Sequence, residues 1–454
     1  MSLEWKTVTL GSCCNFQEGY VNPSQKNPEY FNGDIKWIRA VDLNDSYVYE
    51  TSRTLTREGY NSAGKSALLF KPNTIVISKS GTVGRLGIIK DYMCGNRATI
   101  NIIPHNNISM KFIFYVLKYH QRHFKDMAVG SVQKNLYVSI LENLEIPLPS
   151  IEVQNKIATV LSNIDDKIDC MNKINKNLEE QIETIYNSFF VYYDDYSQEE
   201  LEECEIGLIP KEWKLLSLGE VTTQIKEKVG DKDYKVFSAV NTGNLILSEE
   251  YFDKQVFSKS IEKYIVVKQK EFAYNPARIN IGSIGRNDFD YDGCVSPVYV
   301  AFKVEEEYEN FMNMFIQSDR FKQWVITLAS GSVRQTLNYA DFSIIKLAYP
   351  PIDLIKKFNN IYDNYYEVIN YNKSVIHNLE KIRDILLPKL MSGEIDVSKI
   401  NCDLIIVNNH LSNSIFSTTS APLSVNLYSL PFLTSGLIHS TSSCAFSSDN
   451  TFEI

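Results

Sequence analysis

The sequence predicts a mixed α/β protein in which two similar globular domains are separated by two long helices that pack together as an antiparallel coiled coil. Three observations lead to this prediction. Short sequence blocks recur in the same order in the two halves of the chain, and a heptad-spaced apolar segment follows each half. The chain of 454 residues is also too long for one ordinary core.

The internal repeat is visible in three blocks. Residues 4–6 and 10–11 (EWK and LG) return at 212–214 and 218–219, at an offset of 208. Residues 81–85 (GTVGR) return at 282–286 (GSIGR), and residues 130–132 (GSV), followed by Leu136, return at 331–333, followed by Leu337, both at an offset of 201. We therefore expect each half to be one structural unit, a domain with an appendage.

The two globular domains are predicted at residues 1–150 and 212–350. Residues 68–78, 99–103, 266–274 and 298–304 have the β-branched and aromatic content of short strands, interrupted by Gly, Asn and Pro. Residues 110–127 and 308–329 carry the apolar stripe of a helix.

The appendages are predicted to be spacer helices at residues 151–193 and 351–400. Their apolar positions are spaced alternately by four and three residues, which is the pattern of a coiled-coil seam. The predicted seam consists of Ile157, Leu161, Ile164, Ile168, Asn175, Leu178, Ile182, Phe358, Tyr362, Tyr365, Ile369, Asn372 and Leu379. Asn175 and Asn372 either fix the register of the two helices or are tolerated near solvent.

Two further segments are expected to carry no core. Residues 194–211 are rich in Glu and are predicted to be a solvated linker. Residues 401–454 contain no Lys or Arg and 17 Ser or Thr, without a sustained period, so this tail is predicted to be disordered.

The charge distribution leaves a nucleic-acid partner open. The formal net charge is −9, but residues 1–150 carry 17 basic and 12 acidic side chains, whereas residues 151–211 carry 5 and 14. Most of the acidity thus lies in one helix and its linker, and a local basic face remains possible in both domains. No signal peptide or membrane span is evident, so we expect a soluble, cytoplasmic protein.

Catalytic and metal-binding motifs are not evident. The eight cysteines form no CxxC pair, and the six histidines form no HExxH group, so we expect structural thiols and no metal. Residues 59–66 match the phosphate-loop pattern GxxxxGK[ST], but they lack the preceding strand and the following helix. Residues 275–278 (NPAR) and 27–30 (NPEY) are similar to an amino-methyltransferase loop, but neither keeps its second proline, and a turn built from Asn and Pro explains them better.

Polar and basic side chains beside the repeated glycines are the candidate DNA contacts. Arg85 and Arg286 occupy the same predicted slot after a Gly-x-x-Gly turn, whose backbone can approach a ligand closely. Arg and Gln can read base edges, while Lys and Ser suit phosphates. The full candidate set is Lys79, Ser80, Arg85, Arg97, Gln133, Lys134, Asn135, Arg278, Arg286, Arg334 and Gln335, each of which can alternatively be a turn residue facing solvent.

Five segments together resemble the specificity subunits of Type I restriction-modification systems. They are residues 37–45 (WIRAVDLND), 79–89 (KSGTVGRLGII), 130–169, 207–221 (GLIPKEWKLLSLGEV) and 386–398 (LLPKLMSGEIDVS). The resemblance implies two target-recognition domains that each read half of a split DNA sequence, held apart by two helices. It also implies docking of two modification subunits that use S-adenosylmethionine to methylate adenine, and of restriction subunits that use ATP and magnesium, with no cofactor in this chain.

Three alternative functions remain open. The chain also fits a specificity subunit of a related two-part restriction enzyme that cuts beside its site. The phosphate-loop match instead suggests a nucleotide-binding protein, which would lose binding on Lys65→Ala. A scaffold or adhesion protein on a coiled-coil stalk fits the helices but leaves the repeated glycine blocks unexplained.

Overall fold

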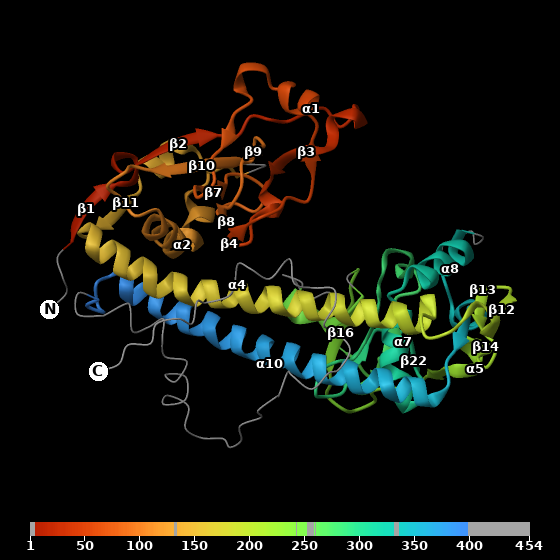
Figure 1. Cartoon of the computed structure of the whole chain (residues 1–454). Coiled ribbons are helices and arrows are strands. Elements are labelled where there is room, and N and C mark those ends of the chain that lie inside the picture. The colour runs from red at the N-terminus through yellow and green to blue at the C-terminus, as the bar shows by residue number, and fades with distance from the viewer. Residues whose placement is uncertain are drawn as a thin grey trace, which may run out of the picture. The chain divides into compact units, whose positions relative to one another are not determined.

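The computed structural model describes residues 5–130, 134–241, 243–251, 258, 260–330 and 336–397 (Figure 1). The predicted Ser/Thr-rich tail at 401–454 lies outside the described residues. Three candidate DNA contacts also lie outside them, namely Gln133, Arg334 and Gln335. Met1–Ile400 form one compact unit.

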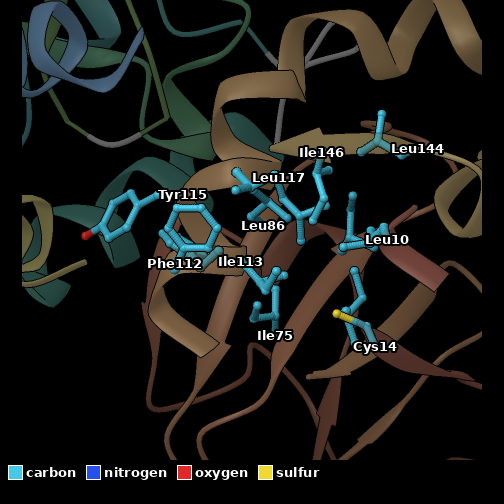
Figure 2. Close-up of a cluster of buried hydrophobic side chains, with 14 of the residues drawn as sticks. Leu10, Cys14, Ile75, Leu86, Phe112, Ile113, Tyr115, Leu117, Leu144 and Ile146 are labelled. Carbon is cyan, nitrogen blue, oxygen red and sulfur yellow. The ribbon is translucent and has the colours of Figure 1, made fainter. Parts of the chain in front are cut away.

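The first domain is built around a five-stranded sheet (Figure 1). The strand order is β2 (Cys14–Glu18), β10 (Thr99–Pro104), β7 (Ile75–Ser78), β8 (Leu86–Ile89) and β4 (Ser46–Val48). Strand β4 runs parallel to β8, and the other pairs are antiparallel. Helix α2 (Met110–Met127) contributes Phe112 and Ile113 to the same buried cluster as Ile75 and Leu86 of the sheet (Figure 2).

A second sheet completes the first domain. Its strand order is β5 (Thr54–Leu55), β3 (Phe31–Ile38), β9 (Met93–Gly95) and β6 (Leu69–Phe70), with helix α1 (Arg57–Asn61) nearby. Strand β1 (Lys6–Thr9) pairs with β11 (Glu145–Leu148), which follows the short helix α3 (Val138–Glu142). This pairing joins the beginning of the domain to its end.

The second domain repeats this plan. Its main sheet has the order β15 (Thr223–Ile225), β22 (Val300–Lys303), β19 (Phe272–Tyr274) and β20 (Ile284–Arg286). The companion sheet has the order β17 (Leu245–Leu247), β16 (Lys235–Ala239), β21 (Gly293–Val295) and β18 (Ile265–Val267). Strand β14 (Lys214–Ser217) pairs with β23 (Lys346–Tyr349), as β1 pairs with β11. The helices are α5 (Leu218–Val221), α6 (Ser248–Tyr251), α7 (Glu309–Phe315), α8 (Asp319–Ser330) and α9 (Tyr339–Ser343).

The helices predicted inside the two domains are found with one difference. The helix predicted at 110–127 is confirmed as α2. The single helix predicted at 308–329 is wrong, because the chain there forms α7 and α8 with a break around Ser318. The hydroxyl of Ser318 accepts a hydrogen bond from the N–H of Phe321 at 3.3 Å and so begins the second helix as an N-cap.

Two long helices follow the domains, as the apolar period predicts. Helix α4 (Ile151–Asn187) begins at Ser150, whose hydroxyl accepts from the N–H of Val153, and helix α10 is Ile352–Met391. Asp165 of α4 pairs with Arg383 of α10 at 2.9 Å. Further along α4, Asn175 pairs with Asn372 at 2.8 Å, so the helices run antiparallel.

The buried face of these helices agrees largely with the predicted seam. The buried seam residues are Ile157, Leu161, Ile168, Asn175 and Ile182 in α4, and Phe358, Tyr362, Ile369 and Asn372 in α10. Leu178, Tyr365 and Leu379 are half-buried. Ile164 is half-buried as well, and the neighbouring Asp165 is only 5% exposed.

The segment predicted as a solvated linker is folded into a hairpin. Strands β12 (Leu201–Cys204) and β13 (Gly207–Pro210) pair in antiparallel register around a turn. Ile209 is buried, and it belongs to the same apolar cluster as Trp213 of the second domain. Most other hairpin side chains are exposed, which agrees with the high Glu content of this segment.

Candidate nucleic-acid interface

The turn between β7 and β8 presents several of the predicted contact residues. Gly81 and Gly84 have left-handed backbone angles, with φ of 76° and 89°, which favour glycine. The hydroxyl of Ser78 accepts the N–H of Arg85 at 2.9 Å, and its main-chain oxygen accepts the N–H of Gly84. The turn is thus fixed by its backbone and by one buried hydroxyl, while the side chain of Arg85 is exposed.

Two other loops meet this turn at Lys79. The N–H of Lys79 donates to the oxygen of Ala98 at 2.7 Å, and its oxygen accepts the N–H of Leu136 at 2.8 Å. These bonds bring the Arg97 turn and the segment with Lys134 beside Lys79. The structure therefore gathers residues that are far apart in the sequence, namely Lys79, Ser80, Arg97, Lys134 and Asn135.

The charges at this junction are only partly paired. The ammonium of Lys79 is 2.7 Å from Oε1 of Glu18. Burial would raise the pKa of Glu18, but hydrogen bonds from Lys79 and Tyr20 outweigh it and hold that pKa below its usual value. Arg97 and Lys134 are exposed, and Lys134 donates to the main-chain oxygen of Lys125 at 3.2 Å.

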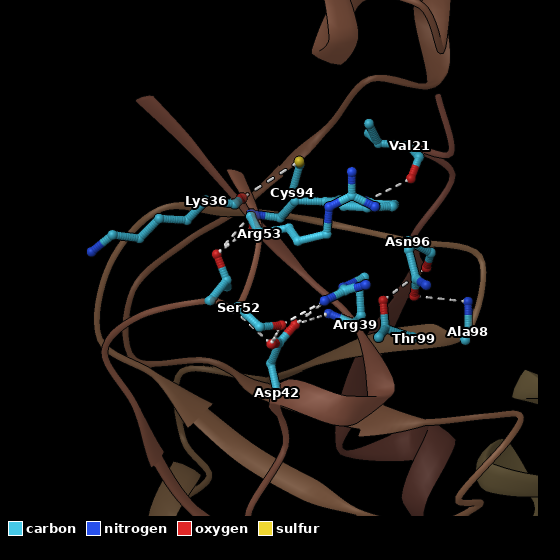
Figure 3. Close-up of polar contacts among 12 residues, drawn as sticks. Val21, Lys36, Arg39, Asp42, Ser52, Arg53, Cys94, Asn96, Ala98 and Thr99 are labelled. Carbon is cyan, nitrogen blue, oxygen red and sulfur yellow. Dashed lines mark hydrogen bonds and ion pairs between the residues drawn. The ribbon is translucent and has the colours of Figure 1, made fainter. Parts of the chain in front are cut away.

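Arg39 lies beside this junction and was missed by the sequence prediction (Figure 3). Its guanidinium lies 5.3 Å from the centre of the Trp37 ring and donates to the hydroxyl of Ser52 at 2.5 Å, while its N–H donates to Asp42. The N–H of Asn96, next to Arg97, donates to the oxygen of Ile38. A signal was available, since Arg39 and Asp42 stand three residues apart in the segment WIRAVDLND.

A second stacked arginine lies on the same small sheet. The guanidinium of Arg53 is 4.1 Å from the centre of the Phe31 ring and donates to the amide oxygen of Gln25 at 2.6 Å. Stacking on a ring restricts a planar guanidinium in advance, which suits recognition of a guanine edge or a phosphate. Arg39 and Arg53 are therefore two further half-buried cations of the first domain that are held against aromatic rings.

The corresponding turn of the second domain is identified by its backbone hydrogen bonds. The N–H of Ser78 donates to the oxygen of Arg85 at 2.8 Å, and the N–H of Asn275 donates to the oxygen of Ser283 at 2.9 Å. Each acceptor follows a left-handed glycine, Gly84 or Gly282. Ser283 is therefore the counterpart of Arg85.

The predicted equivalence of Arg85 and Arg286 is consequently wrong, and Arg286 is buried, unlike the exposed Arg85. Arg286 pairs with Phe272 on the neighbouring strand, as Ile88 pairs with Ile75 in the first domain. It takes a core position and is 2% exposed.

The remaining candidate of the second domain, Arg278, is exposed on its turn. The main-chain oxygen of Asn275 accepts the N–H of Arg278 at 3.0 Å, and its amide oxygen accepts the N–H of Ala277 at 3.0 Å. This is the turn chemistry of Asn and Pro, and it accounts for the NPAR segment. The N–H of Leu337 donates to the oxygen of Pro276, as that of Leu136 does to Lys79.

The phosphate-loop match does not form a phosphate loop. Gly59 lies within helix α1, and residues 64–66 form a short 3-10 turn. A Cβ at Gly59 would lie 2.2 Å from the main-chain oxygen of Tyr30, so this glycine serves close packing.

Other chemistry is not apparent in the described part of the chain. Within it, no group of three or more potential metal ligands is present, and the six described cysteines are free. No described helix is long and apolar enough to cross a membrane.

Comparison with known proteins agrees with this geometry. The family model of the Type I restriction modification DNA specificity domain matches residues 2–180. The specificity subunit of the Type I restriction enzyme MjaIX from Methanocaldococcus jannaschii is 27% identical over 84% of this chain and 91% of its own length. The putative type I specificity subunit S.MpnORF638P from Mycoplasma pneumoniae is 30% identical over 45% of this chain and 52% of its own length.

A solved structure shows the same fold. The crystal structure of the S subunit of a Type-I restriction-modification system from M. genitalium superposes with a TM-score of 0.51 at 16% identity, over 86% of this chain and 96% of that chain. The predicted resemblance to the specificity subunits of Type I restriction-modification systems and the predicted fold class are confirmed.

Proposed function

We propose that this chain recognises a split DNA sequence, with one half-site read by each domain. The observation that carries the proposal is the repeated turn, held in both domains by the same backbone hydrogen bonds and a left-handed glycine. In the first domain this turn gathers exposed cations, which suit phosphates and guanine edges. Each domain thus offers its own reading surface, and the chain contributes recognition rather than catalysis.

The two long helices would fix the separation of the half-sites. Helix α4 has 37 residues, which at 1.5 Å per residue is about 55 Å. Their antiparallel packing, with a buried Asn175–Asn372 hydrogen bond, favours one register. A rod with one register holds two domains at one separation, which a split target requires.

The same helices would bind the modification subunits. Ile174, Tyr371 and Ile385 are large apolar side chains that are 45%, 66% and 60% exposed on the helices. Such side chains offer apolar contacts to a protein partner that docks along the helices. We propose that two modification subunits dock there with S-adenosylmethionine, and that restriction subunits supply the ATP- and magnesium-dependent steps.

Sequencing of methylated DNA tests the proposal. Cells that express this chain with its cognate modification subunit should methylate adenine in a split sequence, and cells lacking either protein should not. Absence of new methylation with an active modification subunit would contradict the proposal.

Salt-dependent binding locates the surface. For the assembled complex, the DNA association constant falls as the salt concentration rises. Arg85→Ala should make the slope of the logarithm of this constant against the logarithm of the salt concentration less steep by about 0.9, which is the contribution of one phosphate contact. The matched control is Lys65→Ala, which removes an exposed cation from the 3-10 turn of the same domain. Equal effects of the two variants, or loss of discrimination at both half-sites with Arg85→Ala, would refute the assignment.

A further inference from the structure

One buried guanidinium joins the second domain to helix α10. Arg286 lies on β20 with its side chain 1% exposed. Its Nε donates to Asp288 at 2.6 Å, Nη1 donates to Asn310 of α7 at 2.8 Å, and Nη2 donates to the hydroxyl of Tyr362 of α10 at 3.2 Å. A single side chain thus connects a strand, a domain helix and a spacer helix.

The partners of Arg286 are themselves bonded to α10. The amide of Asn310 donates to Asn359 at 3.2 Å and to Asp363 at 3.0 Å. The amide of Asn313 donates to the hydroxyl of Tyr362 at 3.1 Å. The guanidinium also lies 5.8 Å from the centre of the Tyr362 ring. These directional contacts restrict how α7 and β20 can sit on α10, because a hydrogen bond weakens steeply when its angle changes.

The first domain is joined to the helices by different groups. That junction is centred on a carboxylate of the spacer helices, since Asp165 of α4 accepts from the hydroxyl of Tyr115 at 2.7 Å and from Arg383 at 2.9 Å. Lys118 of α2 is 3.7 Å from the same carboxylate. In the second domain the junction is centred on a buried cation of the domain itself, Arg286. Each junction can therefore be altered without touching the other.

We propose that Arg286 is a positioning residue that fixes the orientation of the second domain on α10 and thereby the number of base pairs between the two half-sites. A planar guanidinium holds its donors in one fixed fork, unlike an ammonium on a flexible stem. Replacement of Arg286 loosens the seating of the domain but leaves the exposed turn at Arg278 unchanged. This inference rests on the proposed reading of a split sequence.

The test uses the complete complex and sequencing of methylated DNA. Wild type should methylate one spacer length. With Arg286→Lys and Arg286→Gln, methylation at spacers one base pair longer or shorter should rise at least tenfold relative to the wild-type spacer, while both half-site sequences stay the same. Lys322→Gln, an exposed change on α8, is the matched control and should keep the wild-type spacer profile.

Tyr362→Phe covers the case in which the Arg286 variants fail to assemble. It keeps the ring and removes only the hydroxyl that bonds Arg286 and Asn313. It should raise methylation at spacers one base pair longer or shorter relative to wild type, because Arg286 and Asn313 both lose this partner on α10. Methylation confined to the wild-type spacer in every assembled variant, or a changed second half-site sequence, would overturn the inference. Absence of split-site methylation in wild type would instead overturn the proposed function.

Discussion

The buried Asn175–Asn372 hydrogen bond provides a sharp test of the helix pairing. The two side chains are 6% and 7% exposed, and the amide of Asn372 donates to Asn175 at 2.8 Å. Asn175→Leu or Asn372→Leu alone leaves a buried amide without its partner, which costs about 1–3 kcal/mol. Replacement of both by Leu removes both polar groups, so the helix pairing should be as stable as in wild type or more stable.

Hydrogen exchange measured by mass spectrometry reports the local stability of the helix pairing, on peptides from the middle of α4 and α10. A loss of about 1–3 kcal/mol corresponds to amide exchange roughly 5- to 150-fold faster in each single variant. The double variant should return to the wild-type rate or below it. Exchange in the double variant as fast as the product of the two single effects would refute the reasoning, because the two residues would then act independently.

Three further predictions concern the domains. Gly84→Ala should lower stability by about 1–2 kcal/mol and more than Gly81→Ala, as measured by thermal unfolding, because both glycines are left-handed but only a Cβ at Gly84 would meet Phe124, at 3.2 Å. Burial raises the pKa of Glu309 to about 7, so its ionisation reduces stability as pH rises from below 4.5 through 7. Glu309→Gln should stabilise the protein by about 1 kcal/mol at pH 8, after allowance for solvent screening of a half-buried group, and have no effect below pH 4.5. Alkylation of the native protein at pH 8 should modify Cys170 and Cys204 before the three buried thiols of Cys14, Cys94 and Cys294. Burial raises the pKa of each of these three to about 12, so few of them are present as the reactive thiolate. Equal labelling of all five in peptide mass spectra would contradict this prediction.

The elements with a strong period were predictable from the sequence. Helix α2 and the two spacer helices follow from apolar stripes that local spacing determines. Asp165 was not predictable in this way, since its burial depends on Tyr115 and Arg383, which are distant in the sequence. The hairpin at residues 201–210 was also missed, because its Glu-rich strands bury only Ile209 and Pro210.

Equivalent positions in the candidate sites of the two domains were predictable only where the structure keeps the sequence offset of 201 residues. The offset of 201 correctly pairs Leu136 with Leu337, because both donate to the turn after the same strand. It fails at Arg286, because the backbone hydrogen bonds match Ser78 with Asn275 and Arg85 with Ser283, at offsets of 197 and 198 rather than 201. A shift of one to three residues changes which side chain enters the core, and a sequence block alone does not reveal such a shift.

Under the proposed function, the corrected alignment would explain how a repeated fold reads two unlike half-sites. Lys79 corresponds to Pro276, since both accept the N–H of the repeated leucine, and Arg85 corresponds to Ser283. The matched positions thus share backbone geometry but differ in charge. Because left-handed glycines and main-chain hydrogen bonds hold each turn, most of its side chains are free to differ without loss of the turn. Exchange of the turn residues between the domains should therefore change the recognised bases and the salt dependence while leaving the fold intact.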